Sequence, residues 1–369
     1  MIGGAVLRGL QRWRGAGEYT ITLPPMDGAL RANDAIESAS LVLATAEPDN
    51  LARAGSRYYL SQGNALIEID FRDSGALGVH VGEFDVPISA LAGDDKGNLI
   101  AGFEDGRLRF VAGPRAGEGL GPHIAAASCP TALMIDGNSL LVCQGSAHNP
   151  PSGWKRDLMQ RRASGSVWRV MLDGGTAEQL AGGIAFPYGL SRTADGAIVV
   201  AESWRHRLLA LGADGSTKVL LDGLPGYPAR LAPASDGGHW LCIFAPRSRL
   251  VEFTLTERDF CADMLLQLEP EHWIAPALSS GQSFLEPLQG GGVKQMGILK
   301  PWAPSLSYGL LAKLDVDFQL RESFHSRAGG TRHGITSCIE HSGRVLVASR
   351  GGNALVALPT GDEQTEAAP

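Results

Sequence analysis

Long apolar runs are absent from this sequence of 369 residues. No stretch approaches the roughly 18 uninterrupted apolar residues that a membrane-spanning helix needs, so we expect no membrane span. The apolar stretch before Arg8 is also too short for a secretory signal peptide. A cytoplasmic protein is the resulting expectation.

Cysteine is scarce, and so is an excess of positive charge. The five cysteines are an odd number, are widely spaced and contain no C-x-x-C pair, which excludes a disulfide framework and a typical zinc site. All except Cys261 lie in or beside apolar runs, as expected for buried cysteines. With 32 basic and 39 acidic residues the net charge is -7, which argues against nucleic acid or an anionic membrane as the main partner.

Two common catalytic motifs are also missing. No serine has the G-x-S-x-G spacing of a nucleophile elbow. The glycine runs at 182–183 and 290–292 do not open a strand–helix phosphate cradle.

Glycine, in contrast, is abundant. The chain has 48 glycines and 21 prolines, where glycine usually supplies roughly 7% of residues. Because 44% of the residues are hydrophobic, the chain is folded and rich in tight turns. A helical bundle is the fold class that this composition most nearly excludes.

A short pattern, Pro-x-x-Leu, recurs along the chain. It begins at Pro48, Pro130, Pro187 and Pro228, and a variant one residue longer begins at Pro87. Most copies continue with a turn signal and an apolar strand, and a sixth copy at 333–358 lacks the proline. A period of roughly 40 residues with three or four short strands is typical of a β-propeller blade.

Six copies predict an all-β, six-bladed β-propeller over residues 46–358; an ordinary β-sandwich is the alternative. Residues 1–45 form an N-terminal extension, in which 19–23 or 41–44 would supply an outer strand that closes the ring with blade six. The polar tail at 359–369 is expected to be disordered.

Two long loop insertions interrupt the blades. The first spans 146–160, between the second and third strands of blade three. The second spans 262–307 and is expected to carry a short helix around 264–269. Loops of this length are typically lids or binding elements, so we expect a covered pocket on the face that they share.

Three segments resemble the blades of strictosidine-synthase-like proteins. They are 186–208 (FPYGL…DG…VVAES…HRL), 224–240 (LPGYP…GHW) and 335–343 (ITSCIEHSG). The resemblance covers roughly residues 45–358. It implies a six-bladed propeller related to gluconolactonase and paraoxonase propellers, in a family that includes a condensing enzyme, hydrolase-like proteins and proteins of unknown role.

The resemblance also implies positions for metal ligands. Related hydrolases hold calcium through acidic and amide residues just after the blade-opening proline, and calcium takes six to eight oxygens. Here the openings hold Asp49, Ile88, Thr131, Tyr188 and Ala229. Asp49 is the only carboxylate, with Asn50 beside it, and Ala229-Arg230 replaces the family's Asp-Asn. We therefore predict no calcium and no other cofactor.

The catalytic glutamate of the condensing enzyme aligns with Thr336. A threonine hydroxyl without a partner is no general base at neutral pH. The sequence therefore argues against Pictet–Spengler chemistry.

Cations and aromatic residues nevertheless gather at the expected pocket. We expect a small anionic or aromatic ligand to bind there, held by arginines over Trp204 and Tyr188. A solvated rim of loop charges is the alternative. The candidate ligand-binding residues are Asp49, Asn50, Thr131, Tyr188, Trp204, Arg230, Thr336 and Arg350.

Catalysis would rest on histidine. His206 with Glu202, or His333 at the opening of blade six, could act as general base on an ester or lactone; alternatively these are ordinary hydrogen-bonded histidines. Two functions therefore stand: a metal-independent, hydrolase-type enzyme acting on a small molecule, or a non-catalytic propeller that binds a metabolite or a protein partner.

Overall fold

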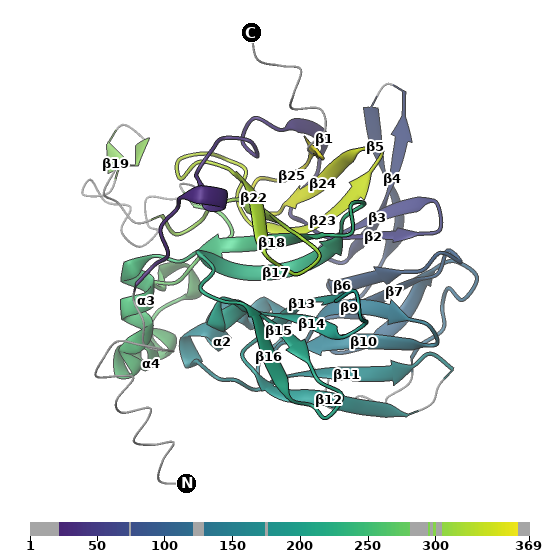
Figure 1. Ribbon diagram of the computed structural model, residues 1–369, viewed down its shortest axis with the longest axis horizontal. Coiled ribbons are helices and arrows are strands. Elements are labelled where there is room, and N and C mark those ends of the chain that lie inside the picture. The colour runs from purple at the N-terminus through teal and green to yellow at the C-terminus, as the bar shows by residue number, and fades with distance from the viewer. Residues whose placement is uncertain are drawn as a thin grey trace.

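The computed structural model describes residues 22–73, 75–120, 129–173, 176–280, 294–295, 298–299 and 305–360. Six antiparallel sheets, each of three or four strands within this part of the chain, form the blades of a β-propeller. The predicted all-β, six-bladed fold is therefore confirmed (Figure 1).

The blades follow one another along the chain. The first three consist of β2 (Pro48–Ala54), β3 (Arg57–Gln62), β4 (Ala65–Arg72) and β5 (Gly75–Glu83); β6 (Ile88–Gly93), β7 (Leu99–Phe103) and β8 (Leu108–Ala112); and β9 (Pro130–Asp136), β10 (Ser139–Gln144), β11 (Gly165–Met171) and β12 (Ala177–Ile184). The last three consist of β13 (Pro187–Arg192), β14 (Ile198–Glu202), β15 (Arg207–Leu211) and β16 (Thr217–Leu221); β17 (Gly226–Pro233), β18 (His239–Pro246), β21 (Leu310–Leu314) and β22 (Leu320–His325); and β23 (Ile335–His341), β24 (Arg344–Ser349), β25 (Ala354–Pro359) and β1 (Ser40–Ala44).

The recurring prolines mark the start of four of the six innermost strands; β17 begins two residues before Pro228, and β23 has no such proline. β2, β9 and β13 begin at Pro48, Pro130 and Pro187, and β6 begins one residue after Pro87. Proline suits the first position of a strand because its missing N–H is not needed there. The repeated pattern therefore marks the part of each blade that faces the central channel.

The second strands carry the apolar runs because both of their faces are covered by neighbouring blades. Every residue of β7, β10 and β14 is buried. The hairpin before β14 turns at Gly196, whose φ of 87° favours glycine. Gly189 in β13 is required for close packing between blades, because a Cβ there would lie 2.3 Å from the carbonyl oxygen of Ala229 in the next blade.

The ring is closed by a strand from the N-terminal part of the chain. β1 pairs with β25, and Ser40 lies opposite Ala357. β1 overlaps the candidate segment 41–44, and residues 19–21 of the other candidate lie outside the described residues. Residues 22–39, here called the strap, lead to β1 across blade five, where Asn33 Nδ2 donates to the Ser323 carbonyl at 2.8 Å.

The first insertion lies where the sequence predicts it, between β10 and β11. It contains a 3₁₀ turn (Pro151–Gly153) and the helix α2 (Trp154–Gln160). The buried residues Leu158 and Met159 fix α2 on the propeller.

The second insertion joins β18 to β21 and differs from the expectation. It begins before residue 262 and carries two helices, α3 (Arg249–Thr256) and α4 (Arg258–Gln267), followed by a 3₁₀ turn (Pro270–His272), in place of one helix at 264–269. Ser248 caps α3 by accepting from the Val251 N–H. A two-stranded hairpin, β19 (Lys294–Gln295) and β20 (Ile298–Leu299), follows.

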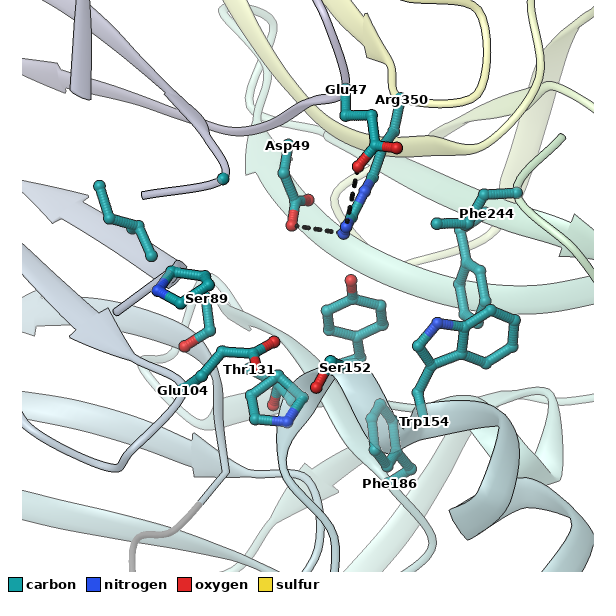
Figure 2. Close-up of a pocket in the computed structure, with 16 residues that line it drawn as sticks. Glu47, Asp49, Ser89, Glu104, Thr131, Ser152, Trp154, Phe186, Phe244 and Arg350 are labelled. Carbon is teal, nitrogen blue, oxygen red and sulfur yellow. Dashed lines mark hydrogen bonds and ion pairs between the residues drawn. The ribbon is translucent and has the colours of Figure 1, made fainter. Parts of the chain in front are cut away.

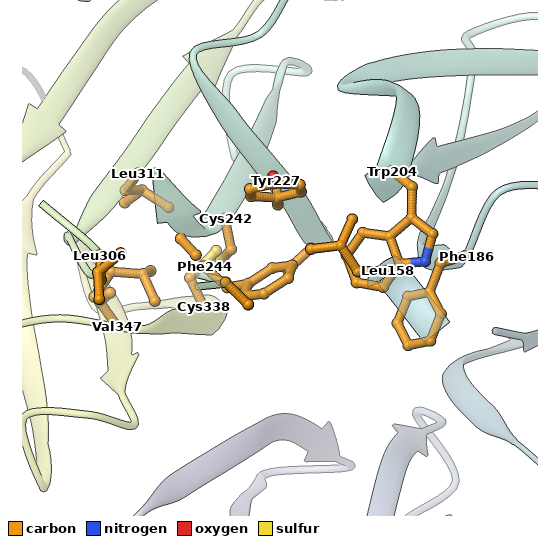
Figure 3. Close-up of a cluster of buried hydrophobic side chains, with 14 of the residues drawn as sticks. Leu158, Phe186, Trp204, Tyr227, Cys242, Phe244, Leu306, Leu311, Cys338 and Val347 are labelled. Carbon is orange, nitrogen blue, oxygen red and sulfur yellow. The ribbon is translucent and has the colours of Figure 1, made fainter. Parts of the chain in front are cut away.

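Helices α2, α3 and α4 lie together at one side of the propeller (Figure 1). A large buried cluster beneath them includes Leu158 of α2, Trp204, Tyr227 and Phe244 (Figure 3). In the described part of the chain, no helix is long and apolar enough to cross a membrane.

Candidate functional site

A cavity of about 150 Å³ lies between the blade openings and the two insertions (Figure 2). An apolar cavity of about this volume holds benzene, so a molecule with one six-membered ring fits. The lining residues are Glu47, Asp49, Gly63, Pro87, Ile88, Ser89, Glu104, Thr131, Pro151, Ser152, Trp154, Phe186, Tyr188, Phe244, Leu278 and Arg350.

The blade openings supply one wall. Asp49, Thr131 and Tyr188 each follow the proline that begins an innermost strand, and all three line the cavity. Arg350, in the loop between β24 and β25, lines it as well. The structure therefore brings together four of the ligand-binding candidates that the sequence predicts.

Asp49 is shared by two arginines. Its Oδ1 lies 2.8 Å from Arg230 Nη1, and its Oδ2 lies 3.2 Å from Arg350 Nη1. Burial alone would raise the pKa of the Asp49 carboxyl, but the charges of Arg230 and Arg350 hold it below its ordinary value. Asp49 is thus an ionised, fully engaged carboxylate.

Both Nη atoms of Arg230 are engaged, whereas its buried Nε has no hydrogen-bond partner within the described residues. Besides Asp49, it donates to the carbonyls of Ser89 at 2.7 Å and Thr336 at 3.2 Å. Its guanidinium carbon lies 4.8 Å from the centre of the Tyr188 ring, in cation–π geometry. The predicted role of Arg230 as a fork for an anionic ligand therefore conflicts with its contacts, because Asp49 already takes that place.

Aromatic rings form the opposite wall. Trp154 meets Phe244 edge to face at 5.3 Å between ring centres, and Tyr188 meets the same Phe244 at 5.5 Å. Figure 2 shows Trp154, Phe186 and Phe244 facing Asp49, Ser89 and Glu104 across the cavity. This wall can hold an apolar or aromatic ring.

Trp204 lies behind this wall. It stacks on Phe186 at 4.3 Å between ring centres, and its Nε1 donates to Asp157 Oδ1 at 2.8 Å. The ring that reaches the cavity is Trp154 of the insertion. Trp204 therefore supports the wall and does not line it.

Of the three carboxylates that line the cavity, Glu104 is the one without an ion-pair partner among the described residues. It follows β7 and is half-buried, and its side chain makes no hydrogen bond or ion pair within the described residues. The other two carboxylates of the wall, Glu47 and Asp49, both pair with Arg350. An unpaired carboxylate can accept a proton from bound water or hold a cationic group.

Glu104 and Trp154 are not among the site residues chosen from the sequence, although Glu104 belongs to a loop that the repeat places on the pocket face. No motif surrounds either of them. The available signal was position: Glu104 comes in the loop between the second and third strands of its blade, as Arg350 does in blade six.

The predicted pair of His206 and Glu202 does not form. The Glu202 carboxylate accepts from Arg205 Nη1 at 3.0 Å, Arg207 Nε at 2.5 Å and the Ala185 N–H at 2.8 Å. His206 follows the 3₁₀ turn Ser203–Arg205 with a φ of 52°, and its Nε2 faces Glu252 Oε1 of α3 at 3.7 Å. Neither residue lines the cavity.

His333 is also placed away from the cavity. Its Nδ1 lies 2.6 Å from the Ser307 hydroxyl, and its Nε2 lies 2.7 Å from the Arg327 carbonyl. Burial lowers the pKa of the ring. Both nitrogens are engaged, and the residue does not line the cavity.

Asn50 and Thr336 lie buried just outside the lining. Asn50 Nδ2 donates to the Ser61 hydroxyl at 2.9 Å, while the Thr336 hydroxyl donates to the Asp49 carbonyl at 3.3 Å. They support Asp49 and Arg230 from behind.

The donor set does not fit a calcium ion. Of the openings, only Asp49 brings a carboxylate, and both of its oxygens face arginines. Calcium takes six to eight oxygen ligands. Among the described residues, no group of three or more His, Cys, Asp or Glu side chains could hold a metal ion.

No protein-family model and no curated protein matches the chain. Among solved structures, a gluconolactonase from Xanthomonas campestris has a TM-score of 0.52 and 14% sequence identity, over 87% of this chain and 88% of that one. A structure described as a candidate gluconolactonase has a TM-score of 0.53 and 12% identity, over 87% and 92%. At such identities the similarity shows the fold alone: the chain is built like the gluconolactonase-type propellers.

Proposed function

We propose that the central cavity is the active site of a metal-independent enzyme of the hydrolase type, with Glu104 as general base. The carrying observation is the unpaired Glu104 carboxylate, which shares one small cavity with the Arg350 guanidinium and an aromatic wall. The strictosidine-synthase-like relationship and a cytoplasmic location stay predictions beside this proposal.

The proposed hydrolysis uses Glu104, a water molecule and Arg350. Glu104 takes a proton from a water molecule as the water oxygen attacks the carbonyl carbon of an ester or lactone. Arg350 stabilises the negative charge that develops on the carbonyl oxygen. When the ester C–O bond breaks, the proton on Glu104 passes to the leaving alkoxide oxygen, so no further reactant is needed.

The charge of the cavity limits the substrate. Glu47, Asp49 and Glu104 outnumber Arg350 on the wall, and Arg230 lies behind it in contact with Asp49. A neutral or cationic substrate suits this balance better than the anionic ligand that the sequence predicts. Its apolar or aromatic part would lie against Trp154 and Phe244.

The decisive experiment is a panel of neutral lactones and aryl esters, assayed with and without EDTA. Lactones belong in it because two structures of this fold are described as gluconolactonases. We expect EDTA to leave kcat unchanged and Glu104→Gln to lower it about 100-fold or more, the typical contribution of a general base. Asp105→Asn, which changes the neighbouring exposed residue, is the matched control and should be neutral.

The opposite pattern would refute the proposal. If hydrolysis survives in Glu104→Gln but is lost in His206→Ala or His333→Ala, the base is one of the histidines predicted from the sequence. Loss of activity in EDTA would contradict metal independence.

A non-catalytic binding site is the second candidate. The observation that favours it is the buried Asp49–Arg230 ion pair, in which the carboxylate and both Nη atoms are engaged by protein groups, as in a structural contact. Ligands that raise Tm without any turnover, with Trp154→Ala abolishing the shift, would support binding alone.

A further inference from the structure

A second and larger cavity, of about 270 Å³, lies between the strap and blade five. Leu23, Pro24 and Met26 of the strap form one side, and Ile243, Ala245 and Leu310 of blade five form the other. Its lining shares no residue with that of the central cavity. It is therefore a separate site.

One buried cation stands in this apolar lining. The Arg247 side chain is only 4% exposed. Its Nε lies 3.3 Å from Glu252 Oε1, and its Nη1 donates to the Leu224 carbonyl at 3.4 Å. The contact with Glu252 is an ion pair without a hydrogen bond, so within the described residues the buried Nε has no hydrogen-bond partner. Nη2 makes no hydrogen bond to a described residue either, although an arginine buried to this degree normally has its donors satisfied.

We infer that the second cavity binds a small amphipathic monocarboxylate, with its apolar body between the strap and blade five and its carboxylate on Arg247. The site is independent of the proposed hydrolase activity.

Arg247 can accept a second carboxylate beside Glu252. A guanidinium offers five N–H donors in a planar fork, and here Glu252 faces the Nε edge. Two other arginines of this protein each hold two carboxylates: Arg107 pairs with Asp85 and Asp105, and Arg350 with Glu47 and Asp49. Glu252 is also held by the Tyr227 hydroxyl at 3.0 Å, so it need not move.

The apolar part of the cavity sets the size of the body. Its volume is about twice that of a cavity known to hold benzene, which suits an aliphatic chain of about eight carbons. Met26 remains 39% exposed and would be covered by such a chain. Tyr308, whose hydroxyl lies 3.3 Å from His325 Nδ1, is the other polar residue of the lining.

Octanoate is the probe, titrated calorimetrically into the full chain with 1-octanol as the neutral control. We expect octanoate to bind at least tenfold more tightly than 1-octanol, because a hydrogen bond to a charged group is worth more than a neutral one. The ¹³C methyl signal of Met26, assigned with Met26→Leu, should shift on addition of octanoate.

Two variants test the two halves of the site. Arg247→Met should weaken octanoate at least tenfold and leave 1-octanol unchanged, whereas Arg321→Met, an exposed arginine of the same blade, should change neither. Ala32→Phe fills the cavity from the exposed strap and should abolish binding of both compounds without disturbing the fold. It keeps the test decisive if Arg247→Met does not fold.

Three results would overturn the inference: equal affinity for octanoate and 1-octanol, unchanged octanoate affinity in Ala32→Phe, or a Met26 signal that does not shift. If Trp154→Ala weakens octanoate instead, the probe binds in the central cavity and the second site is refuted. Glu104→Gln should leave octanoate affinity unchanged, so failure here is separate from failure of the hydrolase proposal.

Discussion

Asp49 is a buried anion held between Arg230 and Arg350, with only 10% of its side chain exposed. Removing one partner of such a pair leaves charge without compensation. We expect Arg230→Met to lower the free energy of unfolding by about 3 kcal/mol, in urea denaturation at pH 7.

Arg53→Met is the matched control for this change. Arg53 pairs with Asp95 at 2.8 Å, but the two side chains are 51% and 90% exposed. Its removal should cost less than about 1 kcal/mol. Equal losses in the two variants would show that the central pair has no special stabilising role.

Glu252 links stability to acid pH. Burial opposes its ionisation, but His206 and Arg247 lower the pKa of the carboxyl from its ordinary 4.5 to about 2. Since the pKa is lower in the folded protein, Glu252 contributes stability above about pH 4.5 that disappears as the pH falls towards 2.

The comparison of wild type with Glu252→Gln isolates this effect. The stability advantage of wild type should shrink by about 3 kcal/mol between pH 6 and pH 2, measured by urea denaturation across the range. A difference that does not depend on pH would mean that the pKa of Glu252 is the same in the folded and the unfolded protein.

The positions of individual residues can be predicted from the sequence where they follow the repeated blade pattern. Asp49, Thr131 and Tyr188 each follow a blade-opening proline, so their convergence could be predicted. His206 could not be placed, because its direction depends on a left-handed φ and on Glu252 from an insertion. The position of Trp154 in the cavity wall could not be predicted either, because α2 reaches the cavity only through tertiary packing.

Among the elements, the insertion at 146–160 is held in place on the propeller by one buried carboxylate. Asp157 of α2 accepts from Trp204 Nε1 at 2.8 Å and from Asn149 Nδ2 at 2.9 Å. Asp157→Ala removes both bonds and leaves a buried indole N–H without an acceptor. We expect limited proteolysis to cut 146–160 at least tenfold faster in this variant.

Asp259→Ala provides the comparison. Asp259 lies on the exposed side of α4 and has no such role. Its cleavage rate should match that of wild type. Equal protection in Asp157→Ala would show that apolar contacts of Leu158 and Met159 alone hold α2 in place.

The strands were easier to predict than the helices. Five blades carry the proline pattern and the sixth repeats only the turn and the apolar run, so six similar copies reinforce one another. The second insertion occurs once and has no such repetition. Its helix α3 begins at Arg249, just after β18 and before residue 262, where the sequence places the start of the insertion.

For the whole molecule, β1 completes blade six and thereby the ring. Deleting residues 1–45 removes this strand and exposes the edge of β25. We expect the shortened protein to lose cooperative thermal unfolding or to aggregate. Deleting residues 1–21 leaves β1 in place and is the control; a sharp, unchanged Tm in both proteins would contradict the closing role of β1.

The pairing of β1 with β25 also orders events during synthesis. The Ser40 hydroxyl donates to the carbonyl of Ala357, a residue 317 positions later. At roughly 5–20 residues per second, a ribosome needs on the order of tens of seconds to cover that distance. Throughout that interval the emerging β1 has no partner strand, so chaperone binding or misfolding through its free edge would be concentrated in the nascent chain, before the last blade has left the ribosome.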